Sequence, residues 1–231
     1  DEDNHIYSID GITYDISVTG FIKSFFEEFD ADSVIQKNHE KWQSDKKSKY
    51  YGFSVDEIKN IWKKNAEEAS RQGSKLHKDI EAFYNDVEYH NDSVEFNFFL
   101  NLNDRLKEKY IPYRTEWIVF DEEIKLAGSV DMCYTDDSDN FYLFDWKRSK
   151  QIKKENQYRK GKGPLNHIDD ANYWHYSLQL NIYKYILEKN YSKYISAMYL
   201  VILHSNQDDY KVISVPDLSA EINLMFEKRM E

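Results

Sequence analysis

The sequence predicts an α/β (α+β) fold, with a mixed central β-sheet of about five strands flanked by helices and an N-terminal helical subdomain. Three observations support this prediction. Apolar residues recur at helical spacing as far as Tyr110, and strand patterns begin after Pro112. The later elements then follow as three strands, a helix, two strands and a helix. The chain has 231 residues, with 41% hydrophobic and 16% aromatic content, which is enough to bury a sizeable core.

Residues 1–72 are expected to form a hairpin and a helical subdomain. Residues 5–15 alternate around Asp10-Gly11, which predicts the hairpin. Ser54 and Glu57 make a capping-box pattern that opens a helix, and Gly73 is expected to break or kink that helix. Helical spacing here and just beyond covers approximately residues 17–28, 32–47, 54–69, 76–84 and 93–110.

Residues 73–231 are expected to form the second part of the chain, which contains the central sheet. Strand patterns cover residues 113–120, 125–134, 141–147, 194–204 and 210–215. A polar connection of about residues 150–168 precedes a helix of about residues 171–189, and a last helix begins near Leu218.

Composition excludes several classes of protein. The net charge of −11 argues against a protein that binds polyanions over its whole surface, although a local basic patch remains compatible with it. Cys133 is the one cysteine, so the chain can form neither a disulfide framework nor a four-cysteine zinc or iron–sulfur site. We expect this thiol to be a small core residue.

The expected location is a reducing compartment inside the cell, with the cytoplasm, nucleus and mitochondrion left open. The acidic start shows no signal or transit peptide and lacks Met, so the chain is expected to be a piece of a larger polypeptide or complex. The longest apolar run, residues 195–203, is too short to span a bilayer, and no membrane partner is expected.

Two carboxylates and a lysine stand in the strand patterns where core residues would be expected. Asp131 and Asp145 lie on neighbouring strands of a predicted β-hairpin, and Lys147 shares a strand face with Asp145. Two such acids can hold Mg²⁺ or Mn²⁺, with the Trp146 carbonyl as a further ligand, and the lysine suits phosphodiester hydrolysis. The alternative is a surface salt bridge between Asp145 and Lys147.

Two helices carry weaker signals. His77 and Glu81 are four residues apart, so both side chains can point at one metal site, or they simply belong to a solvated helix face. Gln179 and Tyr183 have the same spacing on a later helix. By periodicity alone, that helix is a packing helix with two polar residues.

A basic cluster follows the predicted hairpin. Residues 147–162 contain eight cations against one acid, which inverts the sign of the overall charge. Flexible glycines and nearby aromatic side chains fit a loop that meets phosphates and unpaired bases, although a solvated charged loop is the alternative. The residues expected to bind nucleic acid are Arg148, Ser149, Lys150, Lys153, Lys154, Arg159, Lys160, Lys162 and Tyr176.

These features occur in an order that resembles the PD-(D/E)xK nuclease superfamily, and more closely its RecB-like branch. The motifs of that branch correspond here to Gly73–His77, Gly128–Asp131, Asp145–Lys147 and Gln179–Tyr183. The N-terminal helical region is also similar to those of phage, viral and mitochondrial genome-maintenance exonucleases. Residues 73–231 would then be the nuclease core. Several relatives carry four cysteines for an iron–sulfur cluster, which this chain cannot supply.

The resemblance implies a role for each matching residue. The implied metal ligands are His77, Asp131, Asp145 and the main-chain carbonyl of Trp146, and Lys147 is the implied catalytic lysine. Glu81, Glu116, Gln179 and Tyr183 are implied to support the site.

The expected function is therefore Mg²⁺- or Mn²⁺-dependent hydrolysis of DNA, by an exonuclease that acts on ends or single strands in replication, repair or recombination. Two alternatives stay open. One is a non-catalytic nucleic-acid-binding module that keeps the nuclease fold. The other is an endonuclease of the same fold, either restriction-like or RNA-cleaving.

Overall fold

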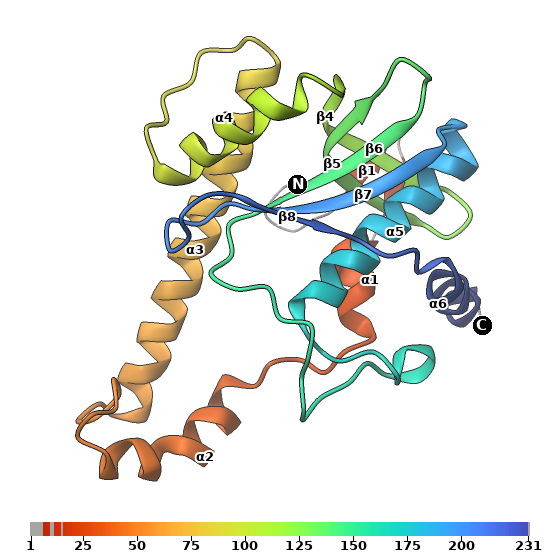
Figure 1. The fold of residues 1–231 in the computed structure, drawn as a ribbon. Coiled ribbons are helices and arrows are strands. Elements are labelled where there is room, and N and C mark those ends of the chain that lie inside the picture. The colour runs from red at the N-terminus through yellow and green to blue at the C-terminus, as the bar shows by residue number, and fades with distance from the viewer. Residues whose placement is uncertain (1–6, 10–11, 15, 231) are drawn as a thin grey trace. The chain divides into compact units, whose positions relative to one another are not determined.

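The computed structural model describes residues 7–9, 12–14 and 16–230 (Figure 1). The chain forms two compact units, one of residues 28–75 and one that combines residues 1–27 with residues 76–231. The domain boundary between residues 72 and 73 stays a prediction. Within the described residues, no helix is both long and apolar enough to cross a membrane.

The N-terminal hairpin is confirmed for the residues described. Strands β1 (Tyr7–Ile9) and β2 (Ile12–Tyr14) pair antiparallel. The expected turn at Asp10-Gly11 lies outside the described residues, as do residues 5, 6 and 15.

The larger unit contains a six-stranded mixed sheet, in which β3, β5, β6, β7 and β8 follow one another and β4 pairs with β5. The β3–β5 and β6–β7 pairs are parallel and the other pairs antiparallel. The predicted fold class is thus confirmed. The strands are β3 (Ile16–Ser17), β4 (Ile111–Asp121), β5 (Leu126–Thr135), β6 (Phe141–Lys147), β7 (Ile195–Ile202) and β8 (Lys211–Ser214).

Strand β3 was not predicted from the sequence. We expected a helix to begin at Ser17, but Ser17 ends a two-residue strand and caps the helix that follows, accepting a hydrogen bond from the Gly20 N–H at 3.0 Å. A two-residue strand is too short for an alternation pattern to reveal.

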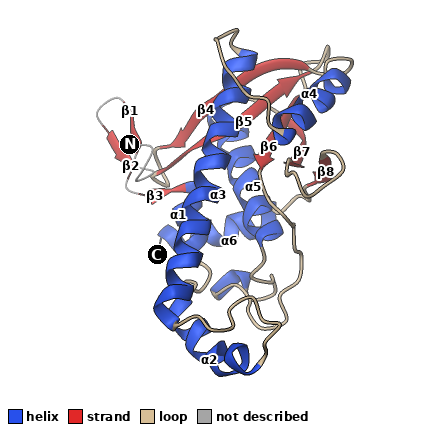
Figure 2. Cartoon of the chain, turned by 90° about the vertical axis from the view of Figure 1, so that its left-hand side faces the viewer, coloured by secondary structure: helices blue, strands red, loops and turns tan. Residues whose placement is uncertain are grey.

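Helices cover both faces of the sheet (Figures 1 and 2). One apolar cluster joins the sheet to α1, α5 and α6, and a second joins its other face to α4 and the end of α3. Cys133 is buried in the first cluster, as predicted. The helices are α1 (Val18–Ser24), α3 (Val55–Tyr84), α4 (Val94–Leu106), α5 (Asn172–Tyr191) and α6 (Ser219–Met230), with a short 3₁₀ turn at Gly163–Leu165.

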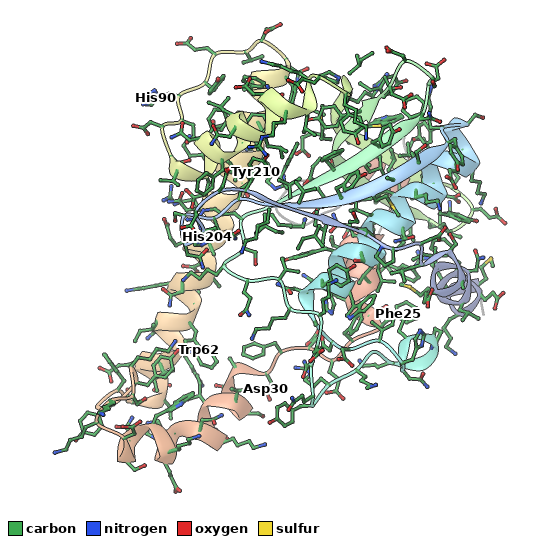
Figure 3. The ribbon with its side chains drawn as sticks, viewed as in Figure 1. Phe25, Asp30, Trp62, His90, His204 and Tyr210 are labelled. Carbon is green, nitrogen blue, oxygen red and sulfur yellow. The ribbon has the colours of Figure 1, made fainter. Side chains whose placement is uncertain are left out.

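The smaller unit consists of α2 (Ala31–Ser44) and the first part of α3. Its core holds Ile35 and Ile58. The indole of Trp62, which is labelled in Figure 3, donates a hydrogen bond to the Tyr50 hydroxyl at 2.6 Å. The predicted capping box is confirmed, since the Glu57 carboxylate accepts hydrogen bonds from the Ser54 N–H and hydroxyl at 2.8 Å.

The break expected at Gly73 is wrong. Helix α3 is 30 residues long and runs through this glycine without interruption. A glycine inside a helix costs about 1 kcal/mol relative to alanine, and the intact hydrogen-bonded turns on both sides are enough to carry the helix through it.

Candidate metal centre

The hairpin of β5 and β6 places the two predicted acids opposite each other. Met132 pairs with Phe144 and Cys133 with Leu143, so the same register brings Asp131 opposite Asp145. The Trp146 N–H donates a hydrogen bond to Asp131 Oδ2 at 2.8 Å and fixes that carboxylate. Both acids are buried, with exposed fractions of 8% for Asp131 and 1% for Asp145.

Lys147 lies against Asp145, as the strand period predicts. Its Nζ is 2.8 Å from each oxygen of the Asp145 carboxylate. The ion pair is not on the surface, because the lysine side chain is only 16% exposed. The alternative interpretation, in which this salt bridge lies on the surface, is therefore wrong. Asp145 Oδ2 is buried and accepts no well-directed hydrogen bond, which leaves it a lone pair to offer a cation.

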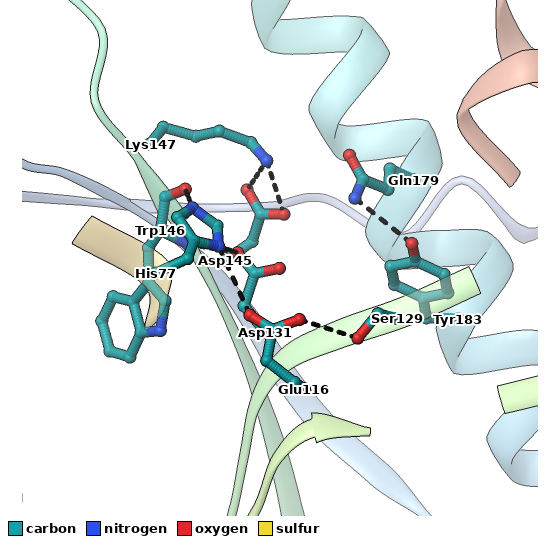
Figure 4. A network of polar contacts seen from close by, with 9 residues as sticks. All are labelled: His77, Glu116, Ser129, Asp131, Asp145, Trp146, Lys147, Gln179 and Tyr183. Carbon is teal, nitrogen blue, oxygen red and sulfur yellow. Dashed lines mark hydrogen bonds and ion pairs between the residues drawn. The ribbon is translucent and has the colours of Figure 1, made fainter. Parts of the chain in front are cut away.

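His77 reaches this hairpin from α3 (Figure 4). Its Nε2 donates a hydrogen bond to the Trp146 carbonyl at 2.8 Å, and its Nδ1 faces Asp131 Oδ2 at 3.6 Å and Glu116 Oε1 at 3.5 Å. The bond from Nε2 orients the ring so that Nδ1 is directed at the two carboxylates. Trp146 thus holds the histidine through the same carbonyl that the sequence suggested as a ligand.

Glu116 reaches the site from β4 by an unusual backbone path. Thr115 pairs with Met132 and Trp117 with Val130, so Glu116 lies opposite Asp131. Its φ of 41° falls in the left-handed region, which is rare for a residue other than glycine and is typical of functional sites. Ser129, which the sequence reading missed, donates a hydrogen bond to Glu116 Oε2 at 2.8 Å.

His77, Glu116 and Asp131 form a group that can hold a metal ion. One ligand atom from each lies within 4.8 Å of the others. Carboxylate oxygens suit Mg²⁺ and Mn²⁺, and an imidazole nitrogen adds preference for the transition metal. The predicted ligands His77 and Asp131 therefore belong to one group. Glu116, which was expected only to support the site, stands among the candidate ligands.

Electrostatics inside the site reflects its crowded charges. Burial lowers the pKa of His77, but the negative charges of Asp131 and Glu116 outweigh it and raise this pKa to about 9. Burial, together with the charge of Asp145, raises the pKa of Asp131 to about 7. Burial also raises the pKa of Asp145, against the opposing charge of Lys147. The pKa of Lys147 is raised because the two aspartates outweigh the effect of its burial.

Helix α5 closes one side of the site. The Gln179 amide donates a hydrogen bond to the Tyr183 hydroxyl at 3.3 Å. The Tyr183 ring lies against Gly128, where a Cβ atom would come within 2.7 Å of the ring. This close approach explains why a glycine stands three residues before Asp131. Tyr176 lies about two turns before Tyr183, and Lys147 Nζ is 4.7 Å from the centre of its ring.

The expected nucleic-acid-binding residues differ in how the structure holds them. Arg148 forms an ion pair with buried Glu95 at 2.9 Å, and Arg159 forms one with Asp170 at 3.1 Å. Lys160 Nζ lies 3.8 Å from Asp169 Oδ1, and the Ser149 hydroxyl donates a hydrogen bond to the Gln151 carbonyl at 3.0 Å. The exposed members are Lys150, Lys153, Lys154, Lys160 and Lys162. Their role in binding stays a prediction.

Glu95 was not predicted to matter for the site, although its ion pair fixes Arg148, the residue after Lys147. Its side chain is 6% exposed and also accepts a hydrogen bond from the Ser205 N–H at 3.3 Å. His204, labelled in Figure 3, precedes that serine and accepts a hydrogen bond at Nδ1 from the Asn206 N–H at 3.1 Å. A glutamate in the first turn of a helix usually interacts with that helix, so its partner 53 positions away carried no local signal. Glu81 lies on α3, half-buried, one turn after His77, and its role also stays a prediction.

Comparisons with known proteins give distant similarities to solved structures. No protein-family model matches the chain, and neither does any curated protein. Among solved structures, the protein SSO0001 matches with a TM-score of 0.38 and 15% identity, over 93% of this chain and 74% of that chain. A candidate exonuclease from Eubacterium rectale matches with a TM-score of 0.37 and 12% identity, over 93% of this chain and 76% of that chain. Similarities of this size say nothing about activity.

Proposed function

We propose that this protein is a Mg²⁺- or Mn²⁺-dependent deoxyribonuclease of the RecB-like branch of the PD-(D/E)xK nucleases, acting as an exonuclease on DNA ends or single strands. The observation that carries the proposal is one cluster around two buried acids: Asp131 opposite Asp145, Lys147 on Asp145, and His77 Nδ1 facing Asp131. Burying so much charge is costly, and a protein without metal chemistry has no need to do so.

The metal would be held by His77, Glu116 and Asp131, with Asp145 beside them. Bound there, it would supply a polarised water and offset the negative charge that develops on the phosphate. The hydrogen bond to Trp146 keeps Nδ1 of the histidine aimed at the site, and Ser129 does the same for Glu116. These bonds reduce the reorganisation needed when a cation binds.

Lys147 is the proposed catalytic cation. Its ammonium has three donors in a largely dry site, where hydrogen bonds to charged groups are strong. Beside Asp145, it can orient a water towards the phosphate and donate to a phosphate oxygen in the transition state. The raised pKa of Lys147 keeps the group protonated for that role.

The test compares Lys147→Met with Lys184→Met. Lys184 is a matched control, because its side chain is 17% exposed and its Nζ lies 2.9 Å from Asp217 Oδ2. We expect wild type and Lys184→Met to degrade single-stranded and double-stranded DNA with Mn²⁺ or Mg²⁺ and to be inactive in EDTA. Lys147→Met should lose at least about 100-fold in rate.

Equal rates for the two variants would refute the catalytic role. Binding of DNA in EDTA without cleavage under any metal would instead favour a non-catalytic binding module. The exonuclease mode is tested with a closed circular single strand, which has no ends. Cutting of the circle would show an endonuclease, and parallel RNA substrates would show whether RNA is also cleaved.

A further inference from the structure

The side chain of Lys147 is held from two directions. On one side its ammonium lies 2.8 Å from both oxygens of Asp145. On the other side it lies 4.7 Å from the centre of the Tyr176 ring, which is within the range of a cation–π interaction. The ring comes from α5, whereas the lysine ends β6. The contact therefore joins two elements that are separate in the sequence.

Tyr176 has surroundings that suit a fixed ring. It is half-buried. Gln179 follows it by three residues and Tyr183 by seven, so all three lie on the same face of α5. Tyr183 is itself fixed against Gly128 on β5. The helix face that packs on one strand of the hairpin therefore presents Tyr176 to the lysine on the other.

We propose that Tyr176 is a positioning residue for Lys147, an inference that rests on the nuclease function proposed above. Asp145 alone is an unreliable anchor for the lysine, since a divalent cation would compete for the same carboxylate oxygens. The face of an aromatic ring attracts the ammonium without being a metal ligand. Tyr176 keeps the ammonium beside the acids in the metal-loaded site, instead of stacking on DNA bases as the sequence suggested.

The kinetic test uses Tyr176→Leu, which removes the ring, and Tyr176→Phe, which keeps it. Tyr185→Leu is the matched control: this half-buried tyrosine is on the same helix, with Lys189 Nζ 5.4 Å from its ring centre. We expect Tyr176→Leu to lower kcat roughly 10- to 30-fold with KM within about twofold of wild type. Tyr176→Phe and Tyr185→Leu should retain the wild-type kcat.

A second readout does not depend on activity. In the metal-free protein, the ¹³C and ¹H signals of the Lys147 ε-methylene should show a ring-current shift. We expect this shift in wild type and Tyr176→Phe but not in Tyr176→Leu, with Lys147→Met used to assign the signal. Thermal melts of each variant show whether it is folded.

The outcomes separate the two proposals. An inactive wild type would refute the nuclease function, while the NMR shift would still decide the contact between ring and ammonium. An active wild type with unchanged kcat in Tyr176→Leu would refute the positioning role. A raised KM, with weaker DNA binding and unchanged kcat, would show that the ring stacks on the substrate and would also overturn the inference. Absence of the ring-current shift in wild type would overturn it without any assay of cleavage.

Discussion

Gly128→Ala should destabilise the protein through a clash with one ring. The added Cβ would lie 2.7 Å from Tyr183 Cε1 and 2.8 Å from Tyr183 Oη, whereas carbon atoms in contact stay about 3.5–4.0 Å apart. Neither side can yield easily, because Tyr183 is 3% exposed and Gly128 is paired with Val119 of β4. Overpacking of this kind costs about 1–3 kcal/mol. For a chain of this size, the melting temperature should fall by roughly 2–12 °C.

Gly73→Ala is the control and has the opposite expected sign. A Cβ at Gly73 meets nothing within 4 Å, and the residue lies inside α3. Alanine should stabilise the helix by about 0.4–1 kcal/mol. Thermal and denaturant unfolding of both variants measures the two effects under identical conditions.

A double-mutant cycle tests the cause. In a Tyr183→Ala background the ring is gone, so Gly128→Ala should cost less than about 0.5 kcal/mol. If Gly128→Ala costs the same with and without the ring, the close contact with Tyr183 is not what requires a glycine. The interpretation of the Gly128–Asp131 motif as a packing requirement would then be wrong.

Three further results are expected. In EDTA, Asp131 and His77 have folded pKa values of about 7 and about 9, above their ordinary 3.8 and 6.5. Each contributes stability that is full below the ordinary value and lost as pH rises through the folded value, so the melting temperature should fall between about pH 4 and pH 9. Asp131→Asn should reduce the fall in melting temperature in the lower part of this pH range. A wild-type melting temperature that does not change with pH would contradict the pKa shifts. Lys150→Gln with Lys153→Gln should weaken DNA binding and reduce its salt dependence by about two phosphate contacts, as measured by fluorescence anisotropy at several salt concentrations. Arg159→Ala should instead lower the melting temperature, because it removes the guanidinium beside the half-buried Asp170 carboxylate and leaves that carboxylate only its contact with His175, at 2.9 Å, of these two contacts. An unchanged melting temperature would show that the ion pair contributes nothing.

Much of the site could be predicted because it depends on local periodicity. The strand period of two places Lys147 beside Asp145, and a short polar turn makes the strands of Asp131 and Asp145 neighbours. The fold class followed from the order of elements in the same way. Both predictions use rules that act over a few residues or between consecutive elements.

The position of Glu116 shows why the rest could not be predicted. The β4–β5 register shifts by one residue between Pro112 and Arg114. Without that shift, Thr115 would lie opposite Asp131, and the glutamate side chain would project from the other face of the sheet. The left-handed φ of Glu116 then directs its carboxylate in a way that no strand pattern specifies. Neither the bulge nor the backbone conformation has a signature in these residue types.

The basic cluster illustrates a second limit. A count of cations treats every lysine and arginine alike, but the partners that hold Arg148 and Arg159 are Glu95 and Asp170. Glu95 is far away in the sequence and reaches Arg148 only through the packing of α4 on the sheet. Which cations are available for a phosphate therefore depends on tertiary contacts. Periodicity and composition do not contain that information.

The charges of the site predict how many protons a metal ion would displace. Counted formally, the three carboxylates (Glu116, Asp131 and Asp145) and the Lys147 ammonium carry a net charge of −2 when His77 is neutral. The metal-free protein reduces this imbalance by protonating His77, with its pKa of about 9, and Asp131, with its pKa of about 7. A divalent cation would supply the same two charges, so binding of Mn²⁺ should release close to two protons at about pH 6, close to one at about pH 8 and almost none above about pH 10. Calorimetric titrations in buffers of different ionisation enthalpy measure this number. If the number of protons released does not vary with pH, the ion does not displace protons from His77 and Asp131.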